Sequence, residues 1–189
     1  MAVKATTVVT LAQAREWCLQ DASDDTRDAI LSLCADAASE RLERETGRVF
    51  KRRTLTETVS ADGVGRVLYL RRFPVVSVAS VTIDGQLAAA SSYAVDADAG
   101  RIFTADGAAF PGGVQNVVIV YDAGYDAASL PSDVVELALQ LTARLFKMRS
   151  RGGSSFEQVS VGGNSFAVRD NLPTDMTRAI ERLRDKRFG

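Results

Sequence analysis

The side chains that most often carry chemistry in proteins are scarce in this chain. It contains no histidine, which is the commonest general base and metal ligand. Its two cysteines, Cys18 and Cys34, lie in helical patterns and fit no disulfide framework or zinc motif. A cysteine nucleophile would need the base that histidine normally supplies, so we interpret both thiols as small core residues. The sequence therefore disfavours most hydrolases and metalloenzymes.

Two short motifs bear a partial likeness to ligand-binding loops. The turn at Gly63-Val64-Gly65 has no third glycine at dinucleotide spacing, and the glycine pairs at 152 and 162 lack the Lys-Ser/Thr of a phosphate loop. The run Asp96–Gly100 resembles the opening of a calcium loop, but its glycine comes early and Gly107 stands where glutamate is required. We interpret this run as a plain turn. The sequence predicts no catalytic residue, no cofactor and no metal.

Charge is the remaining chemical signal. The formal net charge is -1, yet residues 1–47 hold five basic and nine acidic side chains, whereas residues 144–189 hold ten basic and five acidic ones. A polarised molecule can stack on a complementary surface, although ordinary solvated helix faces with a chance asymmetry explain the same counts. Nucleic-acid binding competes as an interpretation, but few aromatic residues accompany the basic ones and the whole chain is slightly acidic.

Length and composition indicate one well-cored domain with extensions, since the chain has 189 residues and 46% of them are apolar. Near the N-terminus, VVTLA is a short apolar island followed by polar residues, unlike a secretory signal. No run approaches the roughly 20 apolar residues that a membrane span needs. We expect a protein that is made in the cytosol and binds no membrane.

The elements that position any functional surface centre on residues 117–150. A β-branched strand, VVIVY, is followed by a break at Gly124 and then by a helix over 131–150. Pro131 suits the first helical turn, and the Ser-Asp pair after it can accept hydrogen bonds from unpaired backbone N–H groups. Gly152-Gly153 ends this helix.

The apolar residues of this helix fall on two lines. One line comprises Val134, Leu137, Ala138, Leu141, Leu145 and Met148, and the other comprises Val135, Leu139 and Phe146. One line suffices for docking on a sheet. The second line predicts either a helix sunk deep in one core or a contact with a neighbouring subunit, which makes Val135, Leu139 and Phe146 the candidate subunit-interface residues.

Two further helices are expected within 10–47, the first capped by Thr10 or Thr7 and the second by Asp24 or Asp25. The expected apolar residues are Leu11, Ala14, Trp17 and Cys18 in the first helix, and Ile30, Leu33, Cys34, Ala37, Ala38, Arg41 and Leu42 in the second. We expect these two helices to pack with the long central helix.

Between 48 and 121 the pattern changes to short alternating strands, with Asp84-Gly85 as the strongest hairpin signal. A second hairpin is expected where SYAVD and GRIFTA flank a turn. The fold class is therefore α+β, in which a helical bundle of an N-terminal helix pair and a long central helix carries an inserted antiparallel β module and a C-terminal helix.

Residues 152–189 form a separate segment in this interpretation. Its first part is rich in Gly, Ser and Asn and is either a mobile loop or a hairpin in which FEQVSV pairs with NSFAV. Its second part, TDMTRAIERLRDKRF, predicts a helix with a narrow apolar face of Met176, Ala179, Ile180 and Leu183 surrounded by basic residues. So narrow a face suggests docking on something larger, but fraying is equally allowed.

The order of elements resembles the head-tail connector, or adaptor, proteins of long-tailed bacteriophages and of phage-derived gene transfer agents. The matching stretches are VTLAQAREWCLQDASDDTRDAILSLCADAASERLERETGRVF, LRRFPVVSVASVTIDG, SSYAVDADAGRIF and VVIVYDAGYDAASLPSDVVELALQLTARLFKMR. The resemblance covers nearly everything from Thr7 to about Arg151, so residues 1–151 correspond to the adaptor core.

This resemblance implies a structural virion protein without an active site. Such adaptors form a ring, commonly of twelve copies, beneath the portal, where they extend the DNA channel and present a surface for the stopper or tail. The implied partners are the portal protein, a stopper or tail-completion protein and other copies of the chain, while DNA only passes non-specifically through the lumen. The implied location is the virion neck, assembled in the host cytoplasm.

The resemblance also implies roles for the C-terminal segment. The candidate portal-docking residues are Arg178, Arg182, Leu183, Arg184, Lys186, Arg187 and Phe188, and the candidate residues of a loop on the tail side are Phe156, Val159, Val161 and Phe166. The rival interpretation is a DNA-binding or DNA-packaging accessory protein, which the basic C-terminal third favours.

Overall fold

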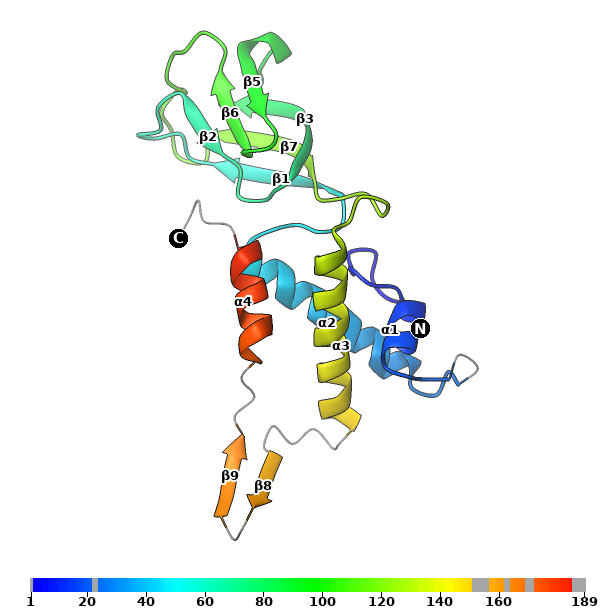
Figure 1. The fold of residues 1–189 in the computed structure, drawn as a ribbon. Coiled ribbons are helices and arrows are strands. Elements are labelled where there is room, and N and C mark those ends of the chain that lie inside the picture. The colour runs from blue at the N-terminus through cyan, green and yellow to red at the C-terminus, as the bar shows by residue number, and fades with distance from the viewer. Residues whose placement is uncertain (1, 22–23, 151–156, 162–163, 169–171, 185–189) are drawn as a thin grey trace. The chain divides into compact units, whose positions relative to one another are not determined.

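The computed structural model describes residues 2–21, 24–150, 157–161, 164–168 and 172–184. These residues form four helices and several antiparallel sheets, which confirms the α+β class (Figure 1). The chain divides into two compact units. A helical unit contains Met1–Thr46 and Pro131–Gly189, and a β unit contains Gly47–Leu130.

The helical unit contains α1 (Leu11–Trp17), α2 (Asp28–Thr46), α3 (Ser132–Ser150) and α4 (Thr174–Leu183). Thr10 caps α1, since its hydroxyl accepts from the backbone N–H of Gln13 while the Gln13 side chain accepts from the Thr10 backbone N–H. Of the two caps predicted for α1, the structure selects Thr10. The second helix begins later than expected because Asp24 accepts from Thr26 in a local turn before it.

The core of the helical unit lies where α1, α2 and α3 meet. Ala14, Leu31, Cys34 and Phe146 form one buried cluster there, with Leu11, Cys18 and Leu145 packed against it. Both cysteines are thus in or beside the core, as predicted. Ala35 and Ala38 are fully buried on α2, and such small side chains allow neighbouring elements to approach closely.

The segment before α1 is fixed along α2 by polar contacts. Asp36 accepts hydrogen bonds from the Thr7 hydroxyl and, at 3.0 Å, from the Lys4 backbone N–H. The Ser39 hydroxyl accepts from the Val8 backbone N–H, also at 3.0 Å. Val8 is buried, so the apolar island near the N-terminus belongs to the core.

The β unit consists of two antiparallel sheets. Their strands are β1 (Arg53–Val59), β2 (Val67–Tyr69), β3 (Val75–Ile83), β4 (Gln86–Leu87), β5 (Tyr93–Asp96), β6 (Arg101–Thr104) and β7 (Val117–Ala123), with a short 3-10 helix, η1 (Ala90–Ser92), before β5. One sheet has the order β1-β7-β3-β4 and the other has the order β2-β6-β5. Figure 1 shows the two sheets as neighbouring layers.

The inner faces of these sheets share one apolar core. Leu68 and Ile102 from the three-stranded sheet and Val81, Ile119 and Tyr121 from the four-stranded sheet are all fully buried in it. The alternation along β7 is strict, because every second residue from Val117 is buried and the residues between them are only half-buried.

Both predicted hairpins of the β unit are present. Asp84 and Gly85 take positive φ angles of 50° and 78° between β3 and β4, as a two-residue hairpin requires. Strands β5 and β6 pair across the turn that begins at Asp96. The strand predicted at Val117 extends to Ala123 and ends before Gly124, where the break was expected.

The segment after α3 contains the hairpin that was one of two predictions for it. Strand β8 (Glu157–Val161) pairs in antiparallel register with β9 (Asn164–Val168). Helix α4 follows and packs on α2 through its buried residues Met176 and Ile180, which confirms its predicted apolar face.

Candidate interaction surfaces

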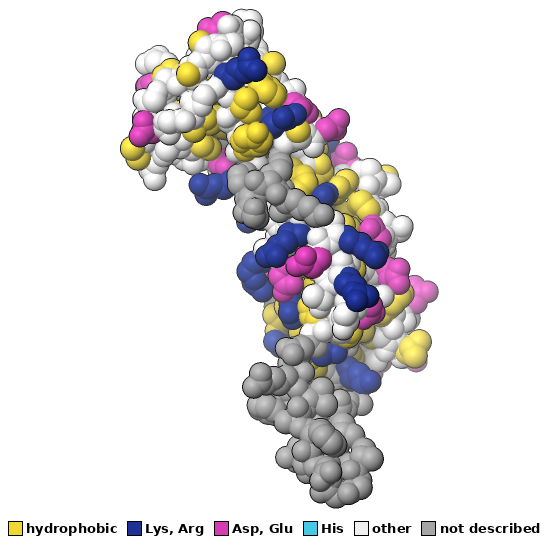
Figure 2. Space-filling model, turned by 60° about the vertical axis from the view of Figure 1, so that its left-hand side comes forward, with side chains coloured by type: hydrophobic (Ala, Val, Ile, Leu, Met, Phe, Trp, Pro, Cys, Tyr) yellow, Lys and Arg dark blue, Asp and Glu magenta, His cyan; other side chains and the backbone are white. Residues whose placement is uncertain are grey.

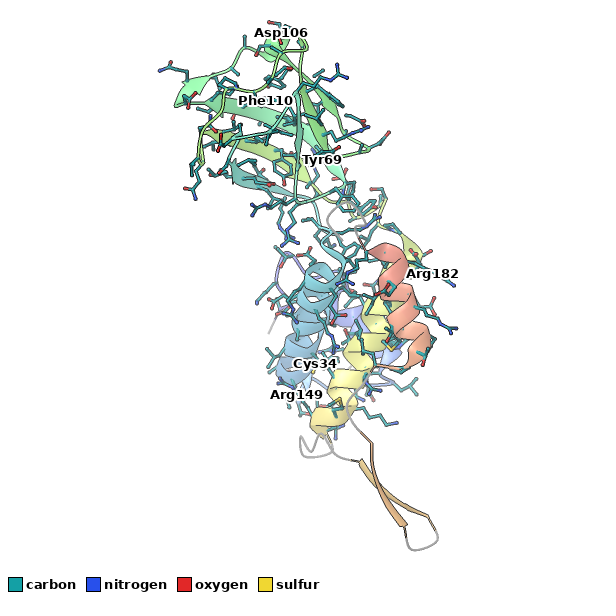
Figure 3. The ribbon with its side chains drawn as sticks, turned by 90° about the vertical axis from the view of Figure 1, so that its left-hand side faces the viewer. Cys34, Tyr69, Asp106, Phe110, Arg149 and Arg182 are labelled. Carbon is teal, nitrogen blue, oxygen red and sulfur yellow. The ribbon has the colours of Figure 1, made fainter. Side chains whose placement is uncertain are left out.

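Helix α4 presents arginine side chains away from its packed face. Arg178 and Arg182 are exposed one helical turn apart, and Arg184 follows at the end of the helix. Arg184 pairs with Glu181 at 3.5 Å, whereas the guanidinium groups of Arg178 and Arg182 make no hydrogen bond or ion pair with any described residue. In Figure 3, Arg182 points away from the other helices. This arrangement leaves two guanidinium groups available to an acidic partner.

The surface around α4 is basic with acidic side chains between. Figure 2, which turns this side of the helical unit towards the viewer, shows Lys and Arg side chains close together with Asp and Glu among them. Of the remaining predicted portal-docking residues, Leu183 is half-buried, and Lys186, Arg187 and Phe188 lie outside the described residues. The portal-docking role of this set stays a prediction.

The second apolar line of α3 is largely covered by the chain itself. Leu139 is 8% exposed and Phe146 is 6% exposed, and Phe146 belongs to the core cluster of the helical unit. Val135 is half-buried. Of the two interpretations left open for this line, the single chain favours a helix sunk in one core, while the subunit-interface role of these residues stays a prediction.

Exposed apolar residues occur instead on the outer face of α2. The prediction that Ile30 and Leu33 face the core is wrong, since they are 45% and 50% exposed. The core positions are Leu31, Cys34, Ala38 and Leu42, so the buried face is rotated from the predicted one. Trp17, predicted on the apolar face of α1, is also exposed.

An ion pair joins α1 to the start of α2. The Nε of Arg15 donates to Oδ1 of Asp28 at 2.7 Å, and its Nη2 donates to Oδ2. Asp28 is buried, and the hydrogen bonds from Arg15 are the main cause that lowers the pKa of its carboxyl group below the ordinary value. The pair therefore favours the ionised carboxylate in the folded state.

We expect Asp28→Asn to weaken the helical unit in a pH-dependent manner. Because the pKa of Asp28 is lower in the folded state, its stabilising contribution is present above the unfolded value of about 4 and is lost as the pH falls through the folded value. Urea unfolding followed by fluorescence of Trp17, the single tryptophan, should show a lower midpoint for the variant at pH 7. The difference should shrink at pH 3, and a difference of equal size there would contradict the role of the charge. Asp25→Asn, at an exposed carboxylate, is the control and should change neither midpoint.

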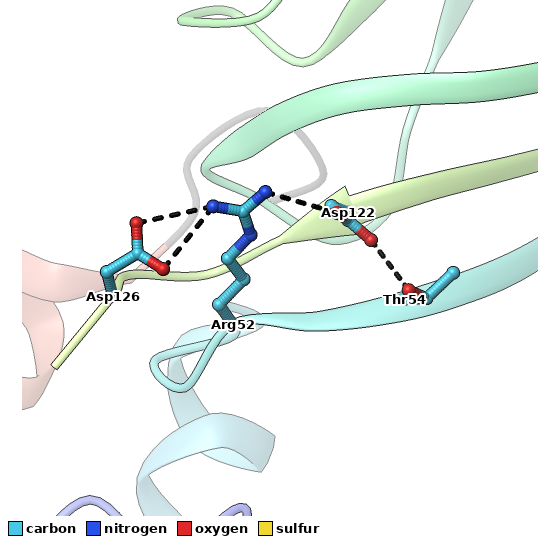
Figure 4. A network of polar contacts seen from close by, with 4 residues as sticks. All are labelled: Arg52, Thr54, Asp122 and Asp126. Atoms are coloured by element: carbon cyan, nitrogen blue, oxygen red, sulfur yellow. Dashed lines mark hydrogen bonds and ion pairs between the residues drawn. The ribbon is translucent and has the colours of Figure 1, made fainter.

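A polar network marks one end of the four-stranded sheet (Figure 4). The guanidinium of Arg52 lies 3.3 Å from the carboxylates of both Asp122 and Asp126. The Thr54 hydroxyl donates to Asp122 at 2.7 Å, and this hydrogen bond, followed by Arg52, lowers the pKa of Asp122. The network carries two carboxylates and one guanidinium, so it has a surplus negative charge.

The chemical motifs singled out in the sequence show ordinary structural roles. Asp96 accepts from the backbone N–H of Ala99 at 3.1 Å and pairs with Arg101 at 2.6 Å, as a plain turn does. Burial raises the pKa of both thiols, Cys18 and Cys34, which disfavours their nucleophilic thiolate forms. Throughout the described ranges, no three His, Cys, Asp or Glu side chains are placed to hold a metal ion.

The tail-side residues predicted from the sequence lie in and before the hairpin of β8 and β9. Val159 and Val161 belong to β8 and Phe166 to β9, with Val159 opposite Phe166 in the register. Phe156 lies outside the described residues. None of the helices in the described part of the chain is both long and apolar enough to cross a membrane.

Comparison with known proteins identifies related structures by their fold. Neither a protein-family model nor a curated protein matches the chain. A chain from the neck of an empty gene transfer agent particle, computed with C6 symmetry, is 22% identical with a TM-score of 0.72, and the match covers 99% of this chain and 94% of that chain.

Two further structures give the same result. A chain from the virion of a native gene transfer agent particle is 22% identical with a TM-score of 0.71, covering 99% of this chain and 94% of that chain. A chain from the neck of a native particle, computed with C12 symmetry, is 22% identical with a TM-score of 0.70, covering 99% and 93%. At this identity the likeness shows that both units of the chain share the fold of these particle components.

Proposed function

We propose that the chain is a structural protein of a virion neck, and specifically an adaptor whose copies form a ring beneath the portal. The observation that supports this most strongly is the fold likeness over 99% of the chain to proteins in necks of gene transfer agent particles. The element order that resembles adaptor proteins points to the same role independently of the comparison. The protein acts by binding and has no catalytic role.

In this proposal α4 docks on the portal. Its apolar face is fixed on α2, so the helix is held in place while Arg178 and Arg182 remain directed outwards. Guanidinium groups pair well with carboxylates, and an acidic surface is therefore the chemistry that fits this helix. The hairpin of β8 and β9 is the segment proposed to receive the stopper or tail, and ring formation uses other copies of the chain.

A second function, a DNA-binding or DNA-packaging accessory protein, is favoured by the same arginines. Phosphate contacts by Arg178, Arg182 and Arg184 would give an affinity for DNA that falls steeply with salt. Figure 2 shows acidic side chains among the basic ones on this surface, which opposes a continuous phosphate-binding stripe. The adaptor proposal is therefore the stronger one.

Electron microscopy of DNA-filled, tail-less heads mixed with the purified chain distinguishes the two proposals. The adaptor proposal expects new ring density below the portal, at a single vertex. Heads that stay unchanged, with the protein retained on free DNA at low salt, would overturn it in favour of the packaging factor.

A further inference from the structure

One end of the β unit carries a concentration of positive charge. Three segments run side by side there, residues 47–53, 71–75 and 122–126. The Val49 N–H donates to the Phe73 carbonyl at 3.1 Å, and the Gly124 N–H donates to the Pro74 carbonyl at 2.9 Å. The basic residues of these segments are Arg48, Lys51, Arg52, Arg53, Arg71 and Arg72.

The acidic residues of these segments are both bound to one arginine. Asp122 and Asp126 each lie 3.3 Å from the guanidinium of Arg52 (Figure 4). The other five basic residues, here called the basic end, are Arg48, Lys51, Arg53, Arg71 and Arg72. The β unit as a whole contains eight basic and eight acidic residues, so the positive excess at this end is local.

Two side chains from the sheet fix the backbone of Arg71 and Arg72. The carboxylate of Glu57, whose side chain is 10% exposed, accepts from the Arg71 N–H at 3.1 Å. The phenol of Tyr121, which is fully buried, donates to Glu57 at 2.9 Å and is hydrogen-bonded to the backbone of Arg72. Both arginine side chains are exposed, that of Arg71 by 72%. The turn therefore presents two adjacent guanidinium groups on a backbone that is held in place.

Two more arginines lie beside this turn. The guanidinium carbon of Arg48 lies 4.3 Å from the centroid of the Phe73 ring. Arg72 donates from Nη1 to the carbonyl of the residue before Arg48, at 3.2 Å. Arg53 lies on the same side of β1 as Glu57, because alternate residues of a strand share a face. Four arginines are thus gathered around one turn.

The composition of the basic end suits phosphate better than a protein surface. Contacts between proteins are centred on apolar side chains, and charged residues are depleted at the centre. In the basic end the large apolar side chain, Phe73, is buried with Arg48 over its ring. The planar guanidinium group pairs with two phosphate oxygens at once, and clustered cations attract a polyanion by releasing its counterions.

We propose that the basic end binds the phosphate backbone of double-stranded DNA, with Arg71 and Arg72 as the principal contacts. The contact is independent of base sequence, because pairs between guanidinium and phosphate groups read no base edge. It goes beyond the proposed adaptor role, in which DNA only passes through the channel, and it uses residues other than the arginines of α4. One copy makes few such pairs, so the contact is weak in a single chain and adds up over several copies.

Fluorescence anisotropy of a short labelled duplex titrated with the purified chain tests the site. The affinity of the wild-type chain should fall steeply with salt and should be equal for duplexes of unrelated sequence. Arg71→Gln/Arg72→Gln should lower the affinity at about 50 mM salt at least about tenfold. It should also reduce the slope of log affinity against log salt by about two, since two phosphate contacts are lost.

Three further variants make the result specific. Arg71→Lys/Arg72→Lys keeps the charge and should keep the salt slope, which a merely structural role of the arginines would not predict. Arg27→Gln/Arg66→Gln removes two exposed arginines outside the basic end and should leave the affinity unchanged. Arg178→Gln/Arg182→Gln should also leave it unchanged, and a loss in this variant alone would overturn the inference in favour of α4.

The outcomes separate failure of this site from failure of the proposed function. Ring density below the portal tests the adaptor role, and the Arg71→Gln/Arg72→Gln variant should form it as the wild type does. A wild-type chain that forms the ring but shows no salt-dependent affinity for the duplex would overturn the site and leave the adaptor role intact. A variant that keeps its affinity for the duplex but forms no ring would overturn the site in favour of an acidic protein partner. Heads without a ring, together with loss of duplex affinity in the variant, would support the site and overturn the adaptor role.

Discussion

Capture of the chain by DNA-filled heads should fall at least about tenfold when Arg178 and Arg182 are both replaced by glutamate. Each exposed ion pair contributes up to about 1 kcal/mol. Reversing a charge adds repulsion from the acidic partner to the loss of the pair. Together the two substitutions exceed the roughly 1.4 kcal/mol that corresponds to a tenfold change. Sedimentation of heads with labelled protein measures the captured fraction.

A matched variant separates a local effect from one of net charge. Arg27→Glu/Lys147→Glu makes the same change in net charge at exposed positions of the helical unit outside α4, and it should leave capture unchanged. Equal losses in both variants would contradict docking through α4 and indicate attraction to DNA or to the head as a whole. Raising the salt should weaken wild-type capture, because exposed charges are screened.

Point substitution tests α4 more sharply than deletion does. Deleting everything after Pro173 should also abolish capture, but it removes Met176 and Ile180 and so uncovers the part of α2 on which α4 packs. The side chains of Arg178 and Arg182 are exposed and make no hydrogen bond or ion pair with any described residue, so their replacement leaves the packed face intact. Unfolding followed by Trp17 fluorescence should give the same midpoint for this variant and the wild type.

Elements fixed by local chemistry were predictable from the sequence. Thr10 caps α1 because a hydroxyl three residues before Gln13 completes a reciprocal pair of hydrogen bonds. Asp84 and Gly85 turn a hairpin because both tolerate positive φ. A helix cap and a hairpin turn depend only on residues that are close together in the chain. The sequence alone is therefore enough to predict them.

The buried face of each helix was less predictable, because it depends on the elements that pack against the helix. Helix α2 has apolar side chains on several sides, so its periodicity allows more than one buried face. The structure buries Ala35 and Ala38, whose small size permits close packing, and leaves the larger Ile30 and Leu33 exposed. In α3 the line that contains Phe146 is buried because α1 and α2 converge on it. No local signal distinguishes that arrangement from a contact between subunits.

Surface features likewise divide into those that depend on residues close together in the chain and those that depend on distant residues. The exposed arginines of α4 could be predicted from the sequence, because the 3.6-residue helical period separates them from the narrow apolar face of this helix. The uncharged row of Thr56 and Thr58 beside Val118 and Val120 on the four-stranded sheet was not found, because it joins strands β1 and β7, which are distant in sequence. The threonines at alternate positions of β1 were the available signal, but the uncharged neighbours on β7 emerge only from the register.

Gly124→Ala is expected to destabilise the β unit by about 2–4 kcal/mol, combining backbone strain with a steric clash. Gly124 has a φ of +106°, and an added Cβ would lie 2.7 Å from the carbonyl carbon of Lys51 and 2.8 Å from the Arg52 nitrogen. These are backbone atoms of the segment entering the unit. That segment is bound to the leaving one by hydrogen bonds between Arg52 and Tyr125 and between Tyr125 and Phe50, each 3.0 Å long.

The strain and the clash can be measured separately, because Gly63 has a φ of +68° with nothing within 4 Å of an added Cβ. Gly63→Ala should therefore cost only the conformational part, about 1 kcal/mol. All four tyrosines lie in the β unit, so urea unfolding followed by near-UV circular dichroism of tyrosine reports this unit. If Gly124→Ala costs no more than Gly63→Ala, the entering and leaving segments separate readily and the close crossing does not hold the unit together. A larger cost for Gly124→Ala means that the close contact between the entering and leaving segments stabilises the β unit.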